Sequence, residues 1–263
     1  MADVTAAPEV AGRRTARVAG LVAGFGVAAL GFVRIGRSFG YDEGITYAFF
    51  VNGGSVRTAL TEQIVFNNHP MFSAIQAVGW QFGLRGETAQ RLGPLFCGAI
   101  VAAVVVAYTT RRVGVIGGAA SGVVLGLNLM FLENVRQLRG YALATMCVLL
   151  AAVAIQRSWH DPRLRWLVAQ GVLATVAVTT HAYSAVTLVM VAAAALALGR
   201  VEVRHVVTWS VAAVSAFVIM LPVLGDMRDN AEARGNLFYD RFPIELVQAL
   251  TGREWFAVAI TSV

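Results

Sequence analysis

Long apolar runs constrain the fold of this chain more than any other feature of its sequence. Each is close to the roughly 17–25 residues that a helix needs to cross about 30 Å of hydrocarbon. The seven runs occupy residues 18–35, 92–110, 113–132, 141–155, 164–180, 183–198 and 206–224. An eighth begins near Trp255. The sequence therefore predicts an all-α, polytopic membrane helix bundle with seven full spans and the start of an eighth.

The composition fits a membrane protein and argues against some partners. Hydrophobic residues make up 57% of the chain, against about 45–50% in an ordinary soluble domain. The net charge is +6, but the arginines stand at the ends of apolar runs and no basic face with interleaved aromatic residues is present, so nucleic acid is not an expected partner. Cys97 and Cys147 lie inside apolar runs without metal-ligand spacing, and both are expected to be core residues.

The membrane topology depends on residues 71–84, a run too short for a comfortable span and typical of an interfacial or re-entrant helix, with Trp80 as an interface anchor. If this run does not cross, the segments on the side of the N-terminus hold ten arginines and four acids. The other side holds eleven of each. Arginine favours the cytoplasmic side, so we expect a cytoplasmic N-terminus and a first span that is retained, not cleaved.

The predicted organisation is one transmembrane module flanked by polar segments, with no soluble domain. Within the first outer loop, residues 55–66 have the pattern of an amphipathic surface helix. The expected segments are a cytoplasmic tail over 1–17, the transmembrane module over 18–224 with its outer loop over 36–70 and short helix over 71–84, a second outer loop over 225–254, and the start of a further span over 255–263.

Asp42 and Glu43 form an adjacent acidic pair directly after the first apolar run. Two neighbouring carboxylates repel each other, which raises one pKa and prepares a general base, or they jointly hold a cation or a hydroxylated substrate. The alternative is a pair of ordinary solvated loop acids. No third ligand with convincing spacing accompanies the pair, so a divalent cation is possible but unsupported, and no metal site or cofactor is assigned.

Histidine and asparagine residues form a second set of candidates. His69 follows Asn67 and Asn68 and precedes Pro70, which suits the first position of a helix. His69 could hydrogen-bond a phosphate or a sugar hydroxyl, or it could be a polar cap at the helix start. His181 lies in a tight turn between two runs, where it either lines the same cavity or is a polar turn residue.

Arginines on the same predicted outer face are suited to a lipid-linked phosphate. Arg91 opens one run, and Arg136 and Arg139 precede Tyr141 at a spacing that would place both on one helix face. Guanidinium groups bind planar oxyanions bidentately and stay charged near a low-dielectric region. The alternatives are arginines that reach the lipid headgroups, or simple pairing of Glu133 with Arg136 or Arg139.

These motifs together resemble a known family. Asp42-Glu43 after the first span, Asn68-His69-Pro70 before a short helix, Arg91 at the head of the next span, Arg111-Arg112 at its inner end and the 139–143 segment Arg-Gly-Tyr-Ala-Leu resemble the protein O-mannosyltransferase and aminoarabinose-transferase-like glycosyltransferases of the GT-C superfamily. The likeness covers residues 14–224, and the chain resembles the N-terminal module of such enzymes. Met71 stands where the family often has a second proline.

The resemblance implies a polyprenyl-phosphate-sugar donor, an acceptor that enters from the outer face, and inverting transfer of the sugar. It would make Asp42 the acceptor-activating acid and Glu43 its partner. Under this hypothesis the donor phosphate meets Arg91, Arg136 and Arg139, and the substrates meet Asn68, His69, Tyr141 and His181. The expected partners are a lipid-linked sugar, a glycan, lipid or protein acceptor, and membrane lipids.

Two other functions compete with this one. A transporter or lipid flippase would carry ionisable residues deep inside its spans, or broken helices in two similar halves. A catalytically silent fragment would bind donor lipid without transferring its sugar. The spans are nearly free of charge and show no repeat, which favours the glycosyltransferase.

Overall fold

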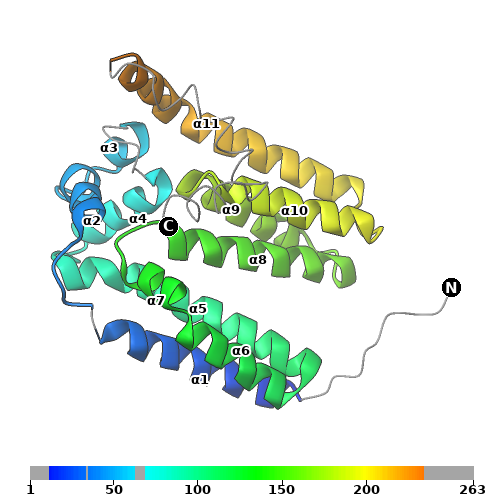
Figure 1. Cartoon of the computed structure of the whole chain (residues 1–263). Coiled ribbons are helices and arrows are strands. Elements are labelled where there is room, and N and C mark those ends of the chain that lie inside the picture. The colour runs from blue at the N-terminus through cyan, green and yellow to red at the C-terminus, as the bar shows by residue number, and fades with distance from the viewer. Residues whose placement is uncertain (1–11, 34, 63–68, 234–263) are drawn as a thin grey trace, which may run out of the picture.

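The computed structural model describes residues 12–33, 35–62 and 69–233, and every regular element in these ranges is a helix. Figure 1 shows them as one bundle of long helices with short helices gathered at one end. In chain order the elements are α1 (Arg13–Phe32), α2 (Tyr41–Ile45), the π-helical turn η1 (Thr46–Val51), α3 (Val56–Thr61), α4 (Pro70–Gln81), α5 (Glu87–Val113), α6 (Val115–Leu127), α7 (Leu129–Arg136), α8 (Tyr141–His160), α9 (Leu164–Thr180), α10 (Ser184–Ala197) and α11 (Val203–Ala233).

The number of full spans differs from the predicted seven. Four helices, α1, α5, α8 and α11, are long and apolar enough to cross a membrane, and the pair α6 and α7 is a fifth only if its 65° bend lies within one span. Helices α9 and α10 are apolar but shorter, with 17 and 14 residues. Each of the seven apolar runs contains a helix over most of its described residues, but the count of seven full spans is not confirmed.

The long helices alternate in direction, so successive turns lie at opposite ends of the bundle (Figure 1). The two ends differ in their chemistry. The site end carries the C-terminal end of α1, the short helices α2 to α4 and the turns between α7 and α8 and between α9 and α10. The opposite basic end carries ten arginines and only two acidic residues in the part of the chain that the structure describes. These are Arg13, Arg14, Arg17, Arg111, Arg112, Arg157, Arg163, Arg165, Arg200 and Arg204, with Asp161 and Glu202.

Small residues bring α1 and α5 into close contact. A Cβ atom built at Gly20 would lie 2.5 Å from the carbonyl oxygen of Ala103, and one at Gly24 would lie 2.9 Å from that of Ala99. Glycine at this four-residue spacing lets two helix backbones approach closely in lipid. The Gly20-x-x-x-Gly24 stripe therefore fixes the first span against the helix that carries Arg91.

The short helices follow the expectation for the first outer loop in part. Ser55 caps α3 by accepting a hydrogen bond from the backbone N–H of Thr58 at 3.1 Å, whereas residues 63–66 of the predicted surface helix lie outside the described residues. Helix α4 has 12 residues, or about 18 Å at 1.5 Å per residue, which is short of a full span. The prediction of a short helix after Pro70 is thus confirmed.

The last helix is longer than the sequence predicts. Helix α11 continues through Pro222 to Ala233, although a loop is expected from residue 225. That expectation is wrong for residues 225–233, while the rest of the predicted loop and the start of an eighth span at 255–263 lie outside the described residues. The two cysteines, Cys97 and Cys147, lie in the main core cluster, as expected.

Candidate functional site

Glu43 and Arg91 form a buried ion pair at the site end. Arg91 donates from Nε to Oε1 of Glu43 at 2.9 Å and from Nη2 to Oε2 at 2.8 Å, which is a bidentate geometry. The side chain of Arg91 is fully buried and that of Glu43 is only 6% exposed. The pair joins α2 to the second turn of α5, so it is part of the framework that holds the site.

The remaining donors of Arg91 hold the segment between α1 and α2. Its Nη1 donates to the carbonyl oxygens of Ile35, at 2.8 Å, and Arg37, and the guanidinium lies 4.8 Å from the ring centre of Phe39. Nη2 also donates to the carbonyl oxygen of Ser38 at 3.3 Å. Arg91 thus has a dense set of partners within the protein, which favours a positioning role over direct contact with a phosphate.

Glu43 also accepts two backbone hydrogen bonds, from Gly40 at 3.0 Å and from Leu138 at 2.7 Å. Burial alone would raise the pKa of Glu43, but the hydrogen bonds from Arg91, Leu138 and Gly40 outweigh it and hold this pKa below its usual value. Glu43 is therefore an ionised, fully engaged carboxylate that fixes the turn between α7 and α8.

Asp42 has a different environment from its neighbour. Its Oδ2 accepts a hydrogen bond from Nη1 of Arg139 at 2.5 Å, and its side chain is 49% exposed while that of Arg139 is 14% exposed. The guanidinium of Arg139 lies 4.9 Å from the ring centre of Tyr141. Asp42 forms an ion pair with Arg139, and Glu43 accepts a hydrogen bond from the backbone of Leu138. Two consecutive residues of α2 therefore contact two consecutive residues of the turn.

His69 occupies the N-cap position of α4, but its side chain makes no capping hydrogen bond. Its Nδ1 lies 3.1 Å from the carbonyl oxygen of Thr180, the last residue of α9. Because a carbonyl only accepts, Nδ1 carries the proton and Nε2 is a hydrogen-bond acceptor. Nε2 is buried and has no hydrogen-bond partner among the described residues.

His69 belongs to a cluster of four aromatic rings. His69 stacks on His181 with ring centres 5.4 Å apart, and Tyr141 lies 5.3 Å from His69 and 5.1 Å from His181. Tyr183 lies 5.5 Å from His181. Burial, with the charges of His181 and Arg139, lowers the pKa of His69 to about 3, and burial with Arg139 also lowers the pKa of His181. Both imidazoles are therefore neutral at physiological pH.

Gly140 allows this packing. A Cβ atom at this position would lie 2.7 Å from Cγ2 of Thr180 and 3.0 Å from Cβ of His69. Real Cβ atoms rarely come so close to other heavy atoms. The glycine between Arg139 and Tyr141 is thus required for α4, α8 and α9 to meet.

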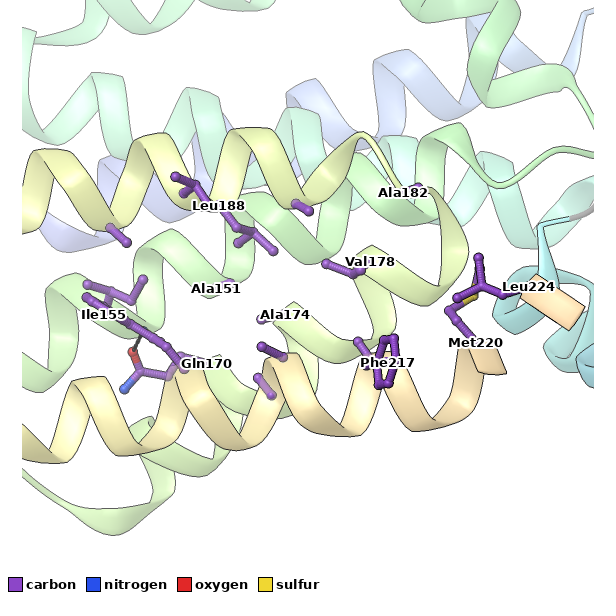
Figure 2. Close-up of a pocket in the computed structure, with 17 residues that line it drawn as sticks. Ala151, Ile155, Gln170, Ala174, Val178, Ala182, Leu188, Phe217, Met220 and Leu224 are labelled. Atoms are coloured by element: carbon purple, nitrogen blue, oxygen red, sulfur yellow. Dashed lines mark hydrogen bonds between the residues drawn. The ribbon is translucent and has the colours of Figure 1, made fainter. Parts of the chain in front are cut away.

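An apolar cavity of about 420 Å³ begins beside these rings and runs between α8, α9, α10 and α11. Ala182, the neighbour of His181, and Leu224 lie at one end of it, and Ile155 and Gln170 lie at the other (Figure 2). Its other lining side chains are mostly alanine, with valine, leucine, Trp209, Phe217 and Met220. The cavity is thus suited to a long apolar chain whose polar end is at the site.

A comparison with protein families identifies the chain. A model of the dolichyl-phosphate-mannose-protein mannosyltransferase family matches residues 67–225, more than half of the sequence. The chain belongs to this family. No curated protein and no solved structure gives a significant match.

Membership in this mannosyltransferase family indicates a membrane glycosyltransferase of the GT-C type, in agreement with the resemblance seen in the sequence. The matched range contains Arg91, Arg139 and His69 but begins after Asp42 and Glu43. The structure connects the two groups, because Glu43 binds Arg91 and Asp42 binds Arg139. The acidic pair therefore contacts the matched part of the chain, although it lies outside the matched range.

The predicted site residues of this mannosyltransferase-family chain do not all lie together. Helix α7 ends at Arg136, so the expectation that Arg136 and Arg139 share a helix face is wrong. Arg136 instead binds Glu133 at 3.1 Å and the carbonyl oxygen of Leu30 at 3.0 Å. Asn68 lies outside the described residues. The site roles given to these residues stay predictions.

Sequence reasoning missed several residues that build the site. Leu138 and Thr180 act through backbone groups, and Gly140 acts through its lack of a side chain. Backbone roles leave little trace in a single sequence. Tyr183 had a usable signal, since it stands two residues after His181 in the same turn. Within the described ranges no group of three or more histidine, cysteine or acidic side chains is placed to hold a metal ion.

Proposed function

We propose that this protein transfers a sugar from a polyprenyl-phosphate donor to a hydroxyl or amine of an acceptor, with inversion, at the site end of the bundle. The observation that carries the proposal is the 2.5 Å contact between a half-exposed Asp42 and Arg139. It places an accessible carboxylate beside a guanidinium that is fixed on the α8 side of the site. A base and an anion-binding group are the two parts that such a transfer needs.

The acidic pair divides into two roles in this proposal. Glu43 is buried, ionised and engaged by Arg91 and two backbone N–H groups, so it is a positioning residue. Asp42 has an exposed carboxylate that an acceptor can reach. Asp42 is therefore the base, and Glu43 with Arg91 holds α2 in place.

The chemical step is an in-line displacement. Asp42 removes the proton from the acceptor hydroxyl as its oxygen attacks the anomeric carbon of the sugar. The bond between that carbon and the phosphate oxygen breaks, and the electron pair leaves with the polyprenyl phosphate. Arg139 stabilises the charge of the leaving phosphate. Its guanidinium carries five N–H donors, so it can bind both the Asp42 carboxylate and the phosphate.

The apolar cavity offers a path for the donor lipid away from Arg139. With its phosphate near Arg139, its prenyl chain would enter the apolar cavity at Ala182, next to His181 (Figure 2). The cavity offers almost no polar group until Gln170 at its far end. A phosphate at the site and a chain in the cavity thus fit one amphipathic donor.

Neutral imidazoles suit the recognition of sugar hydroxyls. The Nε2 of His69 is an unpartnered acceptor, and Tyr141 and His181 form the aromatic surface around it. Asn68, Tyr141 and His181 remain the other proposed substrate contacts. The excess of arginine at the basic end supports an extracytoplasmic site end, since arginine favours the cytoplasmic side.

The proposal is tested with the full chain in proteoliposomes, supplied with polyprenyl-phosphate mannose labelled in the sugar. We expect label to move to an added glycan or peptide acceptor, with an inverted anomeric centre in the product. A nucleotide-linked mannose serves as the control donor and should give no product. Binding of the lipid donor without transfer to any acceptor would instead support the silent-fragment alternative, and absence of binding would overturn the proposal.

A further inference from the structure

A second groove extends toward the basic end of the bundle, away from the proposed catalytic site. It has a volume of about 450 Å³ and is formed by α5, α8 and α10. Its lining residues extend from Val104, Leu149 and Val191 to Tyr108, Trp159 and Leu198. The mannosyltransferase match assigns no role to it.

The groove changes from apolar to polar in the same direction along α5 and α8. On α5, Val104 and Val105 are followed one turn later by Tyr108 and Thr109, and then by Arg112. On α8, Leu149 and Val153 are followed by Gln156 and Trp159, whereas the groove residues on α10 and at its C-terminal end, such as Val191, Ala194 and Leu198, are apolar. Two of the three helices, α5 and α8, therefore present polar residues to the groove at the basic end.

The polar end of the groove holds donors that suit an anionic headgroup. Nε1 of Trp159 is buried and has no hydrogen-bond partner in the described part of the chain, although a buried indole N–H usually has one. Gln156 donates to the hydroxyl of Tyr108 at 3.3 Å. The guanidinium of Arg112 lies 5.6 Å from the ring centre of Tyr108, which places a positive charge at the mouth.

We propose that this groove binds an anionic phospholipid, with its phosphate near Arg112 and Trp159 and an acyl chain along Val104, Leu149 and Val191. The polarity gradient matches an amphiphile that lies parallel to the helices. The ten arginines and two acids of the basic end select a negative headgroup over a zwitterionic one. This site does not depend on the proposed glycosyltransferase activity.

The experiment uses the purified full chain in detergent and native mass spectrometry with two added lipids of identical acyl chains, phosphatidylglycerol and phosphatidylcholine. We expect severalfold tighter retention of phosphatidylglycerol. R112Q should weaken that retention about fivefold, the effect of one arginine near a lipid surface, whereas R112K should keep most of it. W159F, which removes the indole N–H but keeps an aromatic ring, should also weaken it.

Two further variants separate the groove from general attraction. R17Q removes the same charge from α1 at the same end of the bundle and should leave retention unchanged. A152F fills the groove and should reduce retention of both lipids. Equal retention of the two lipids by the unmodified chain, or equal losses in R17Q and R112Q, would overturn the proposal and leave only non-specific attraction to the basic end.

Discussion

Glu43 and Arg91 are joined by two hydrogen bonds, of 2.9 and 2.8 Å, in a pair from which water is almost completely excluded. Removing one partner of such a pair leaves an uncompensated buried charge, which costs about 3–5 kcal/mol. We therefore expect R91Q to lower the thermal unfolding midpoint of the purified chain strongly, and R91K to lower it less. R57Q, which changes an exposed arginine on α3, is the matched control.

The same variants distinguish the positioning role of Arg91 from the predicted contact with the donor phosphate. If R91Q keeps the unfolding midpoint but loses affinity for polyprenyl-phosphate mannose, Arg91 binds the donor and the positioning role is wrong.

Replacing Arg139 should affect catalysis more than stability. Its ion pair with Asp42 is partly exposed, and such pairs contribute about 0–1 kcal/mol. Loss of a group that stabilises transition-state charge costs roughly 10²–10³-fold in rate. We expect R139Q to lower kcat by this factor with a nearly unchanged unfolding midpoint. R136Q is the comparison, since Arg136 binds Glu133 and the end of α1; equal kinetic losses in both would contradict the assignment to Arg139.

His69 should make the chain less stable in acid. Its pKa is lowered from 6.5 to about 3 in the folded state, first by burial and then by His181 and Arg139. As the pH falls below 6.5, His69 becomes protonated in the unfolded chain but stays neutral in the folded chain. The free energy of unfolding therefore falls until about pH 3. At pH 5 this loss is on the order of 2 kcal/mol.

The measurement is the unfolding midpoint of the unmodified chain and of H69Q at pH 7.5 and pH 5. We expect the difference between the two pH values to shrink in H69Q. An equally large difference in both proteins would show that His69 is not the group responsible.

Gly140 should not tolerate a side chain. In G140A the new methyl group would meet Thr180 and His69 at 2.7 and 3.0 Å, and overpacking of this kind typically costs 1–3 kcal/mol. We expect a lower unfolding midpoint and a weaker affinity for the donor. G126A is the control, since a Cβ atom there meets only Leu30, at an ordinary 3.6 Å; an unchanged midpoint in G140A would contradict the close packing.

The helical class, the apolar runs and the short helix after Pro70 were predictable because they depend on local composition and periodicity. The span count was not, because the predicted 113–132 run breaks at Asn128 with a 65° bend, and the runs that form α9 and α10 give helices of only 17 and 14 residues.

The candidate site was predictable in its residue types but not in its pairings. The sequence places Asp42 and Glu43 side by side, yet only the fold separates a buried Glu43 on Arg91 from a half-exposed Asp42 on Arg139. The contacts of His69 with Thr180 and His181 join residues more than a hundred positions apart. Such pairings depend on which turns meet at the site end, which no local pattern encodes.

The central claim is that Asp42 is the base of the transfer reaction and Glu43 is not. The most direct test is the single-turnover rate of D42N with polyprenyl-phosphate mannose bound at saturation, with D161N, at the basic end, as the matched control. We expect D42N to bind the donor and keep its unfolding midpoint but to lose roughly 10²–10⁴-fold in rate, while D161N retains full activity. A D42N protein that transfers sugar at the unmodified rate would contradict the claim.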